Sequence, residues 1–255
     1  MTRKPGRERV DALLVLRGLA ASRGQAQALL MAGKVTSATV RVDKPGSLLA
    51  HDAPLEVAAG PRFVSRGGDK LDGALDAFAA HGFDAAGRAC VDVGASTGGF
   101  TDCLLQRGAA RVFAVDVGHG QLAQKLRVDP RVDVREGVNA KGLSAADFPC
   151  PIDLVVVDAS FIGLGKLAGA IASLIRPGGE LVALVKPQFE AGREAVSRGR
   201  GVIRDEAVRE AAIASARGDL EAAGFVAIAE VDSAVHGPKG NVERFVYARK
   251  AGDRT

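Results

Sequence analysis

The sequence predicts an α/β protein with a seven-stranded, doubly wound sheet whose last strand is antiparallel, preceded by a small α+β domain. Strand-like apolar runs alternate with helical patterns from residue 89 onward. Several runs, such as Leu154-Val155-Val156-Val157, are apolar on both faces, as in a parallel sheet that helices cover on each side. The last two strands are separated by a long loop without a helical pattern, which favours antiparallel neighbours.

Length and composition fit one large or two modest folded domains. The chain has 255 residues, of which 47% are hydrophobic and 25% charged, and its formal net charge is +4. Cys90, Cys103 and Cys150 lack the spacing of a zinc site or a disulfide framework, so we expect small core residues in a reducing cytoplasm. No apolar run approaches the roughly 20 residues of a membrane helix. We therefore expect no metal, no membrane association and a cytoplasmic location.

The first domain is expected over residues 1–60. Val10 and the leucines after it start a helix, and Ser22 is a favourable N-cap for a second helix that Gly33 ends. Residues 35–57 then have the pattern of short strands separated by Pro- and Gly-containing turns. Two helices that lead into a small sheet, with arginines and lysines around them, are typical of a small nucleic-acid-binding module, although charge alone leaves a merely solvated surface open as the alternative.

The second domain is expected over residues 61–255. Leu71, Ala74, Leu75 and Phe78 form the apolar stripe of a helix expected from Asp69 to about His81. The expected strands of the sheet are Ala89–Val93, Arg111–Val115, Val132–Arg135, Leu154–Asp158, Glu180–Val185, Val226–Val231 and Arg244–Arg249.

The chain is organised around the stretch CVDVGASTGGFT, residues 90–101, which predicts a strand, a Gly-rich turn and a helix. This construction brings backbone N–H groups and a helix N-terminus up to a ligand. Ser96 occupies the middle glycine position of a dinucleotide-binding turn, which disfavours the rival ligand NAD. Asp92 suits a ligand with an amino-acid tail, Asp116 ends the next strand where ribose hydroxyls would lie, and Asn139 lies where an adenine edge would.

Together these residues are typical of an S-adenosyl-L-methionine site. The expected cofactor-binding residues are Asp92, Gly94, Ala95, Ser96, Thr97, Gly98, Gly99, Phe100, Asp116, Asn139 and Asp158.

Four charged residues recur at the carboxyl edge of the predicted sheet. Asp158 and Lys186 end the fourth and fifth strands, while Lys70 begins the helix before the first strand and Glu243 opens the seventh. Because strand ends face the cleft in doubly wound folds, these side chains are expected to converge. Each alone has the alternative of a surface charge or a capping group.

Two resemblances follow from these segments. RVDALLVLRGLAASRGQAQALLMAGKV resembles the small S-four-like RNA-binding domain, whose R-L-D start and S-R-x-x-A helix correspond to Arg9-Val10-Asp11 and residues 22–26. The K-D-K-E residues, with VSRGGDKL, GASTGGFTD, DASFI, LVKPQFE and GNVERF, resemble the FtsJ-like RNA 2′-O-ribose methyltransferases. The combination resembles the TlyA family of rRNA cytidine 2′-O-methyltransferases, which are also labelled haemolysins.

The resemblance implies a Rossmann-like class I S-adenosyl-L-methionine-dependent methyltransferase fold and ribosomal RNA or ribosomal subunits as partners. Carried over residue by residue, the catalytic residues are Lys70, Asp158, Lys186 and Glu243. We expect Lys186 to be the base that takes the proton of a ribose hydroxyl, oriented by Asp158, while Glu243 holds Lys70 or the ribose. The expected RNA-binding residues are Arg9, Arg17, Ser22, Arg23, Lys34, Arg66, Arg198 and Arg200.

Two other functions stay open at this point. A non-catalytic RNA-binding or ribosome-assembly factor could keep the same fold. A membrane-active haemolysin would need an apolar or strongly amphipathic membrane segment. The modified nucleotide and the oligomeric state are not determined by the sequence, although we expect a monomer.

Overall fold

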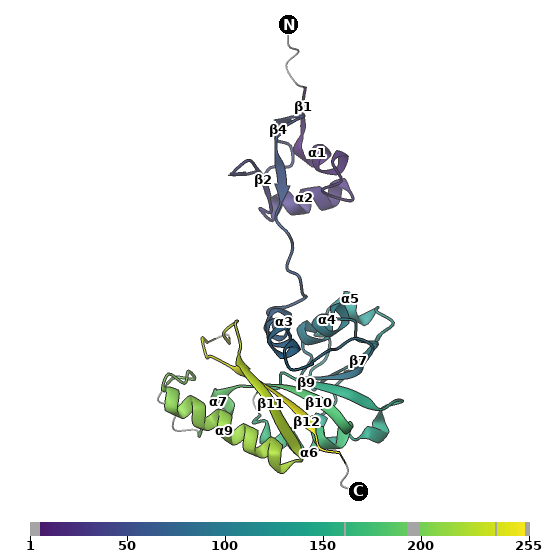
Figure 1. The fold of residues 1–255 in the computed structure, drawn as a ribbon. Coiled ribbons are helices and arrows are strands. Elements are labelled where there is room, and N and C mark those ends of the chain that lie inside the picture. Colours follow the sequence, from purple (N-terminus) through teal and green to yellow (C-terminus); the bar gives the residue numbers. More distant parts are fainter. Residues whose placement is uncertain (1–5, 161, 193–198, 238, 253–255) are drawn as a thin grey trace. The chain divides into compact units, whose positions relative to one another are not determined.

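The computed structural model describes residues 6–160, 162–192, 199–237 and 239–252, and it consists of two compact units that divide between Arg62 and Phe63 (Figure 1).

The first unit contains two helices and two small antiparallel sheets. Strand β2 pairs with both β3 and β5, and β1 pairs with β4. The Oγ of Ser22 accepts a hydrogen bond from the Gln25 N–H at 3.2 Å, which caps α2 as expected. Val10, Leu14, Leu30 and Val35 are buried in one core that joins both helices to the sheet. The elements are β1 (Arg7–Arg9), α1 (Val10–Leu16), α2 (Arg23–Met31), β2 (Val35–Ser37), β3 (Val40–Arg41), β4 (Leu48–Ala50) and β5 (Leu55–Val57).

The second unit is built on a seven-stranded sheet with the strand order β11-β12-β10-β9-β6-β7-β8. Strands β8, β7, β6, β9 and β10 are mutually parallel, and β12 is antiparallel to both β10 and β11. The predicted doubly wound sheet with an antiparallel last strand is confirmed. Its strands are β6 (Ala89–Val93), β7 (Arg111–Asp116), β8 (Val132–Glu136), β9 (Ile152–Val157), β10 (Ile175–Val185), β11 (Phe225–Asp232) and β12 (Arg244–Lys250).

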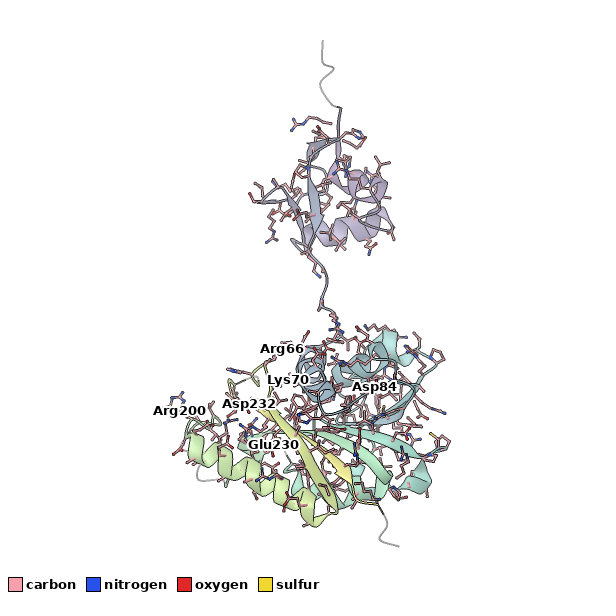
Figure 2. All side chains as sticks on the ribbon, in the orientation of Figure 1. Arg66, Lys70, Asp84, Arg200, Glu230 and Asp232 are labelled. Carbon is pink, nitrogen blue, oxygen red and sulfur yellow. The ribbon has the colours of Figure 1, made fainter. Side chains whose placement is uncertain are left out.

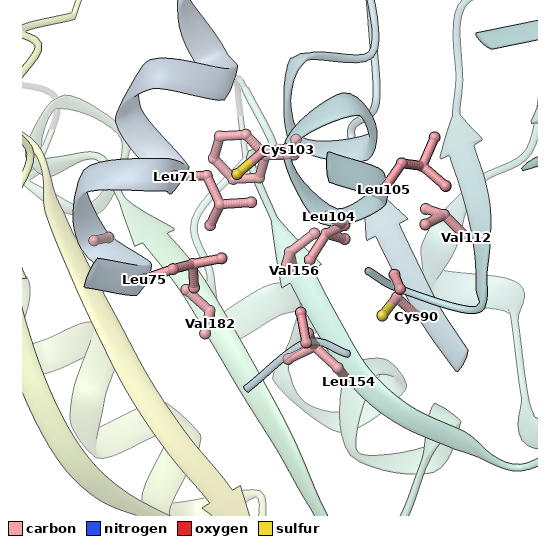
Figure 3. Close-up of a cluster of buried hydrophobic side chains, with 14 of the residues drawn as sticks. Leu71, Leu75, Cys90, Cys103, Leu104, Leu105, Val112, Leu154, Val156 and Val182 are labelled. Carbon is pink, nitrogen blue, oxygen red and sulfur yellow. The ribbon is translucent and has the colours of Figure 1, made fainter. Parts of the chain in front are cut away.

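Helices cover both faces of this sheet (Figure 1). Leu154 and Val156 of β9 belong to the core beneath α3, α4 and α5, which Figure 3 shows, whereas Val155 and Val157 belong to the core beneath α6 and α9. This alternation explains why the run 154–157 is apolar throughout. The helical elements are α3 (Arg66–Ala79), α4 (Gly99–Gln106), α5 (Gln124–Arg127), η1 (Ala140–Gly142), η2 (Ala145–Asp147), α6 (Gly165–Leu174), α7 (Pro187–Glu190) and α9 (Glu206–Ala222).

Helix α3 begins at Arg66, three residues before the predicted start. Glycine is a weak helix former, which is why the sequence pattern suggested a later start. The structure shows a packing reason for the glycines: a Cβ on Gly68 would lie 2.3 Å from the side chain of Phe63, and a Cβ on Gly99 would lie 2.7 Å from the Gly68 nitrogen. Gly99 therefore allows the N-terminal ends of α3 and α4 to touch, and Gly68 leaves room for Phe63.

Candidate active site

The turn after β6 joins the ends of three parallel strands. The Gly94 and Ala95 N–H groups donate to the Val115 carbonyl of β7 at 2.9 and 3.1 Å. Gly94 has a φ of 85°, and a Cβ there would lie 2.9 Å from the Asp158 carbonyl oxygen, directly after β9. Glycine is required at this position because the backbone is left-handed and the neighbouring chain leaves no room for a side chain.

A cavity of about 590 Å³ lies at the carboxyl ends of β6, β7 and β9, within the size range of small-molecule sites. Asp116 is held in its wall, because its Oδ1 accepts from the Gly118 N–H at 2.7 Å and its Oδ2 from the Ser96 N–H at 2.8 Å. Each oxygen keeps a lone pair for a ligand donor such as a ribose hydroxyl. The predicted cofactor residues in this wall are Gly94, Ser96, Asp116, Asn139 and Asp158.

A second cavity of about 300 Å³ adjoins the first, since both are lined by Gly94, Ser96 and Asp158. Lys70 lines this second cavity. Arg66 and His236, which are both exposed, line it as well. Figure 2 shows Arg66 and Lys70 close together at the start of α3. The predicted cofactor residues that line only this cavity are Ala95, Thr97, Gly99 and Phe100.

The four charged residues at the sheet edge form two ion pairs. The Lys70 Nζ lies 2.5 Å from the Glu243 Oε2, and the Lys186 Nζ lies 2.7 Å from the Asp158 Oδ1. Lys70, Lys186 and Glu243 are exposed by only 9%, 8% and 1%, so their charges depend on these partners rather than on water. Lys70 and Asp158 line the same cavity, so one member of each ion pair lies at it.

Ser160 is a site residue that the sequence reasoning missed. Its Oγ accepts a hydrogen bond from the Lys186 Nζ at 2.8 Å, and Ser160 lines the first cavity. Lys186 therefore has two side-chain partners, Asp158 and Ser160, which together fix the direction of its amino group. The available signal was the position of Ser160, two residues after Asp158 in DASFI.

We expect Ser160→Ala to lower kcat by about tenfold, because a hydrogen bond to a charged group is worth roughly 1.5–3 kcal/mol. Ser160→Thr keeps a hydroxyl and should recover most of the activity. If Ser160 had a purely structural role, the presence of the hydroxyl would not decide which of the two variants is active. Steady-state turnover measurements give both kcat values. Equal rates for Ser160→Ala and the unmodified chain would remove Ser160 from the site.

Two predicted cofactor residues, Asp92 and Gly98, line neither cavity. Gly98 instead packs against α5, since a Cβ there would lie 2.2 Å from the Leu126 Cδ1. Asp92 is completely buried, and its Oδ2 accepts from the Thr101 Oγ1 at 2.7 Å, which braces α4 against β6. Its Oδ1 has no hydrogen-bond partner among the described residues. Burial raises the pKa of Asp92 to about 7.

Asp92 is expected to make stability depend on pH. Because its pKa is about 7 in the folded chain and 3.8 ordinarily, the folded chain retains a proton that the unfolded chain releases between these values. The free energy of unfolding should therefore fall as the pH rises through this window, by at most about 4 kcal/mol. Urea unfolding of the cofactor-free protein measures this. Asp92→Asn lacks the titration, so parallel pH curves for the two chains would contradict the expectation.

The predicted RNA-binding residues of the first unit differ in their surroundings. Arg9 and Arg23 both contact the buried Asp11, at 2.9 and 3.2 Å, yet their side chains are 44% and 57% exposed. These arginines lower the pKa of Asp11. Arg17 donates to the Ala53 carbonyl at 2.6 Å and to the His51 carbonyl, which gives it a role in holding that turn.

The remaining predicted RNA-binding residues are Ser22, which caps α2, half-buried Lys34, exposed Arg66 and exposed Arg200, while Arg198 lies outside the described residues.

Comparison with known families shows to which enzyme family this chain belongs. Residues 63–250 match the family model of the FtsJ-like methyltransferases, and residues 8–53 match that of the S4 domain. The chain belongs to the FtsJ-like methyltransferase family. This FtsJ-like methyltransferase uses S-adenosyl-L-methionine as its methyl donor. None of the helices in the described ranges combines the length and the apolar character of a membrane span.

The relatives of this FtsJ-like methyltransferase match it over most of its length. It is 45% identical over 250 residues to the 16S/23S rRNA (cytidine-2′-O)-methyltransferase TlyA of Mycobacterium tuberculosis, covering 97% of this chain and 92% of that protein. A solved structure from Streptococcus thermophilus with a hemolysin designation is 38% identical with a TM-score of 0.71, covering 98% and 90%. The N-methyltransferase NodS of Bradyrhizobium japonicum shares the fold alone, at 17% identity and a TM-score of 0.51, covering 73% and 98%.

The site fits S-adenosyl-L-methionine. The first cavity is large enough for it, and Asp116 offers fixed carboxylate lone pairs to a ribose diol. Gly94 and Ser96 lie at the junction of the two cavities, so a donor seated in the first can present its reactive end to the second.

Proposed function

We propose that this chain transfers a methyl group from S-adenosyl-L-methionine to the 2′-hydroxyl of a cytidine ribose in ribosomal RNA. The proposed substrate is large-subunit rRNA, with small-subunit rRNA as a second substrate. The observation that carries the proposal is that two ion pairs, Lys70–Glu243 and Lys186–Asp158, lie beside the cavity at Gly94. The name of the 45% identical relative and the S4 domain at the N-terminus support RNA as the substrate.

The residue types suit this reaction. A ribose hydroxyl is a weak nucleophile at neutral pH, so the site must align it and remove its proton. The cofactor supplies a methyl group already activated by its sulfonium. In its neutral amine form Lys186 can donate its two N–H groups to Asp158 and Ser160, which leaves the lone pair of its Nζ free to take the hydroxyl proton. Lys70, held by Glu243, presents a positive charge at the second cavity, where the ribose oxygen develops negative charge.

The test is methylation of defined ribosomal particles. Purified protein and methyl-labelled cofactor are incubated separately with large subunits, small subunits and deproteinised rRNA, and the labelled nucleotide is mapped by nuclease digestion and mass spectrometry. We expect label on a cytidine 2′-oxygen in large-subunit rRNA. Label on a base, or on another nucleotide, would overturn the proposed specificity. Cofactor binding without any methylation of RNA would instead favour the non-catalytic assembly factor.

A further inference from the structure

A buried asparagine, Asn241, joins two loops at the edge of the sheet in the second unit. Asn241 is exposed by only 2%. The Asn241 Oδ1 accepts from the Ile203 N–H at 2.9 Å, and its Nδ2 donates to the Gly201 carbonyl, also at 2.9 Å. Both polar atoms of this side chain thus bind the backbone of one short segment, residues 199–204, which we call the basic loop.

The basic loop carries two exposed arginines, Arg200 and Arg204. Neither forms an ion pair with another residue in the ranges that the structure describes, whereas nearby Asp205 is engaged in capping α9 through the Ala207 and Val208 N–H groups. Lys239 adds a third exposed cation, since a Cβ on Gly201 would lie 3.2 Å from its Nζ. Cations gathered on backbone-anchored loops are the usual partners of phosphate groups.

The other loop leads directly to the active site. Residues 233–237 and 239–243, which we call the Glu243 loop, are closed by hydrogen bonds from the Gly237 N–H to the Asn241 carbonyl at 3.0 Å and from the Ser233 N–H to the Glu243 carbonyl at 2.8 Å. A Cβ on Gly237 would lie 2.6 Å from the Glu243 Oε1. The carboxylate that holds Lys70 is therefore packed against the same loop that Asn241 ties to the basic loop.

The Glu243 loop reaches the second cavity, and Asn241 joins the basic loop to it. Figure 1 shows the β11–β12 connection and the segment before α9 extending from the same edge of the sheet. His236 of the Glu243 loop lines the second cavity together with Lys70 and Arg66. A nucleotide whose ribose occupies this cavity would carry its neighbouring phosphates along the Glu243 loop toward Lys239 and Arg200.

We propose that the basic loop is an RNA phosphate-binding surface on the methyltransferase unit itself, and that Asn241 couples its position to Glu243. The proposal rests on the proposed function, because it takes RNA as the substrate. RNA bound by Arg200 and Arg204 holds the basic loop, Asn241 transmits that position to the Glu243 loop, and Glu243 in turn positions Lys70. Asn241 is thus a positioning residue that contacts neither cofactor nor reacting atoms.

The experiment separates RNA binding from turnover. Full-length variants R200A/R204A, N241A and the triple variant are compared with the unmodified chain for affinity to isolated large ribosomal subunits over a salt series, for cofactor affinity and for kcat. The matched control is R131A/R176A. It removes two cations that lie at the amino-terminal ends of β8 and β10, where Arg131 pairs with Asp129 and Arg176 pairs with Asp153.

We expect R200A/R204A to weaken subunit binding about tenfold and to flatten the slope of log affinity against log salt by about 1.4 to 1.8, as for two lost phosphate contacts. N241A removes no charge, yet it should weaken binding to a similar extent and also lower kcat, with cofactor affinity unchanged. The triple variant should bind RNA no more weakly than R200A/R204A, because the loop acts as one unit.

Either of two results would overturn the proposal. The first is that R200A/R204A binds subunits as tightly as the control R131A/R176A, and the second is that N241A keeps the affinity and the kcat of the unmodified chain. Should N241A fail to fold, N241D keeps the acceptor for the Ile203 N–H but loses the donor to Gly201, and it is expected to show the same two effects. Failure of the unmodified chain to methylate any subunit would refute the proposed function, whereas normal methylation with unaffected variants would refute only this inference.

Discussion

Lys186→Ala is expected to reduce methyl transfer by about 10³-fold or more, because general-base catalysis contributes roughly 10²–10⁴ and the ribose hydroxyl has little reactivity without proton removal. Cofactor affinity should stay within about threefold of the unmodified value, since Lys186 does not line the 590 Å³ cavity. The variant therefore separates chemistry from cofactor binding. Single-turnover methylation and calorimetric titration of the cofactor measure the two effects.

The matched control for this variant is Lys166→Ala, which removes an exposed lysine of α6. It should leave both quantities unchanged. Turnover by Lys186→Ala at the rate of this control would exclude Lys186 as the base and would shift attention to Lys70, the other buried amine at the site.

Gly94→Ala should abolish cofactor binding and turnover together. Its φ of 85° strains any other residue, and the added Cβ would lie 2.9 Å from the Asp158 carbonyl oxygen and 3.2 Å from the Ala159 nitrogen. Left-handed strain costs roughly 1–2 kcal/mol and overpacking roughly 1–3 kcal/mol more. The methyl group would also displace Asp158 from Lys186, so we expect losses of about 100-fold or more in both cofactor affinity and kcat.

Gly82→Ala separates the two causes. Gly82 has a similar φ of 81°, but nothing lies within 4 Å of a Cβ built on it. This control should lose a little stability and keep its activity. If Gly94→Ala binds the cofactor as well as Gly82→Ala does, close packing at Gly94 does not shape the site. Calorimetric titration and thermal unfolding of both variants give the comparison.

The coupling of RNA binding to Glu243 would give the two units separate tasks. The S4 domain presents Arg9 and Arg23, both held by Asp11, while the basic loop acts beside the chemistry. Arg17 and Ser22 have local structural partners, so substituting them would change the stability of the first unit as well as any RNA contact. Arg9 and Arg23 also have a local partner, the buried Asp11, so a test of RNA recognition at any of these four residues needs a parallel measurement of stability.

Local patterns were sufficient to predict the sheet and to place two of the candidate catalytic residues at its carboxyl edge. Apolar runs such as residues 154–157 are continuous because both faces are covered, and this burial is visible in the sequence. The residues directly after such runs, Asp158 and Lys186, lie at the carboxyl edge by the geometry of parallel strands. Gly94 could be recognised in the same way, because a turn at that point needs a left-handed residue.

The sequence led us to expect that the four charged residues converge, but only the tertiary structure decided how each of them is paired. Lys70 and Glu243 are 173 positions apart, and no periodicity indicates that they form an ion pair. Ser160 beside Lys186, Asp92 turned toward Thr101 and Asn241 between two loops are likewise set by packing. The physical reason is that periodicity reports how much of a residue is buried, whereas its partners depend on how distant segments pack together.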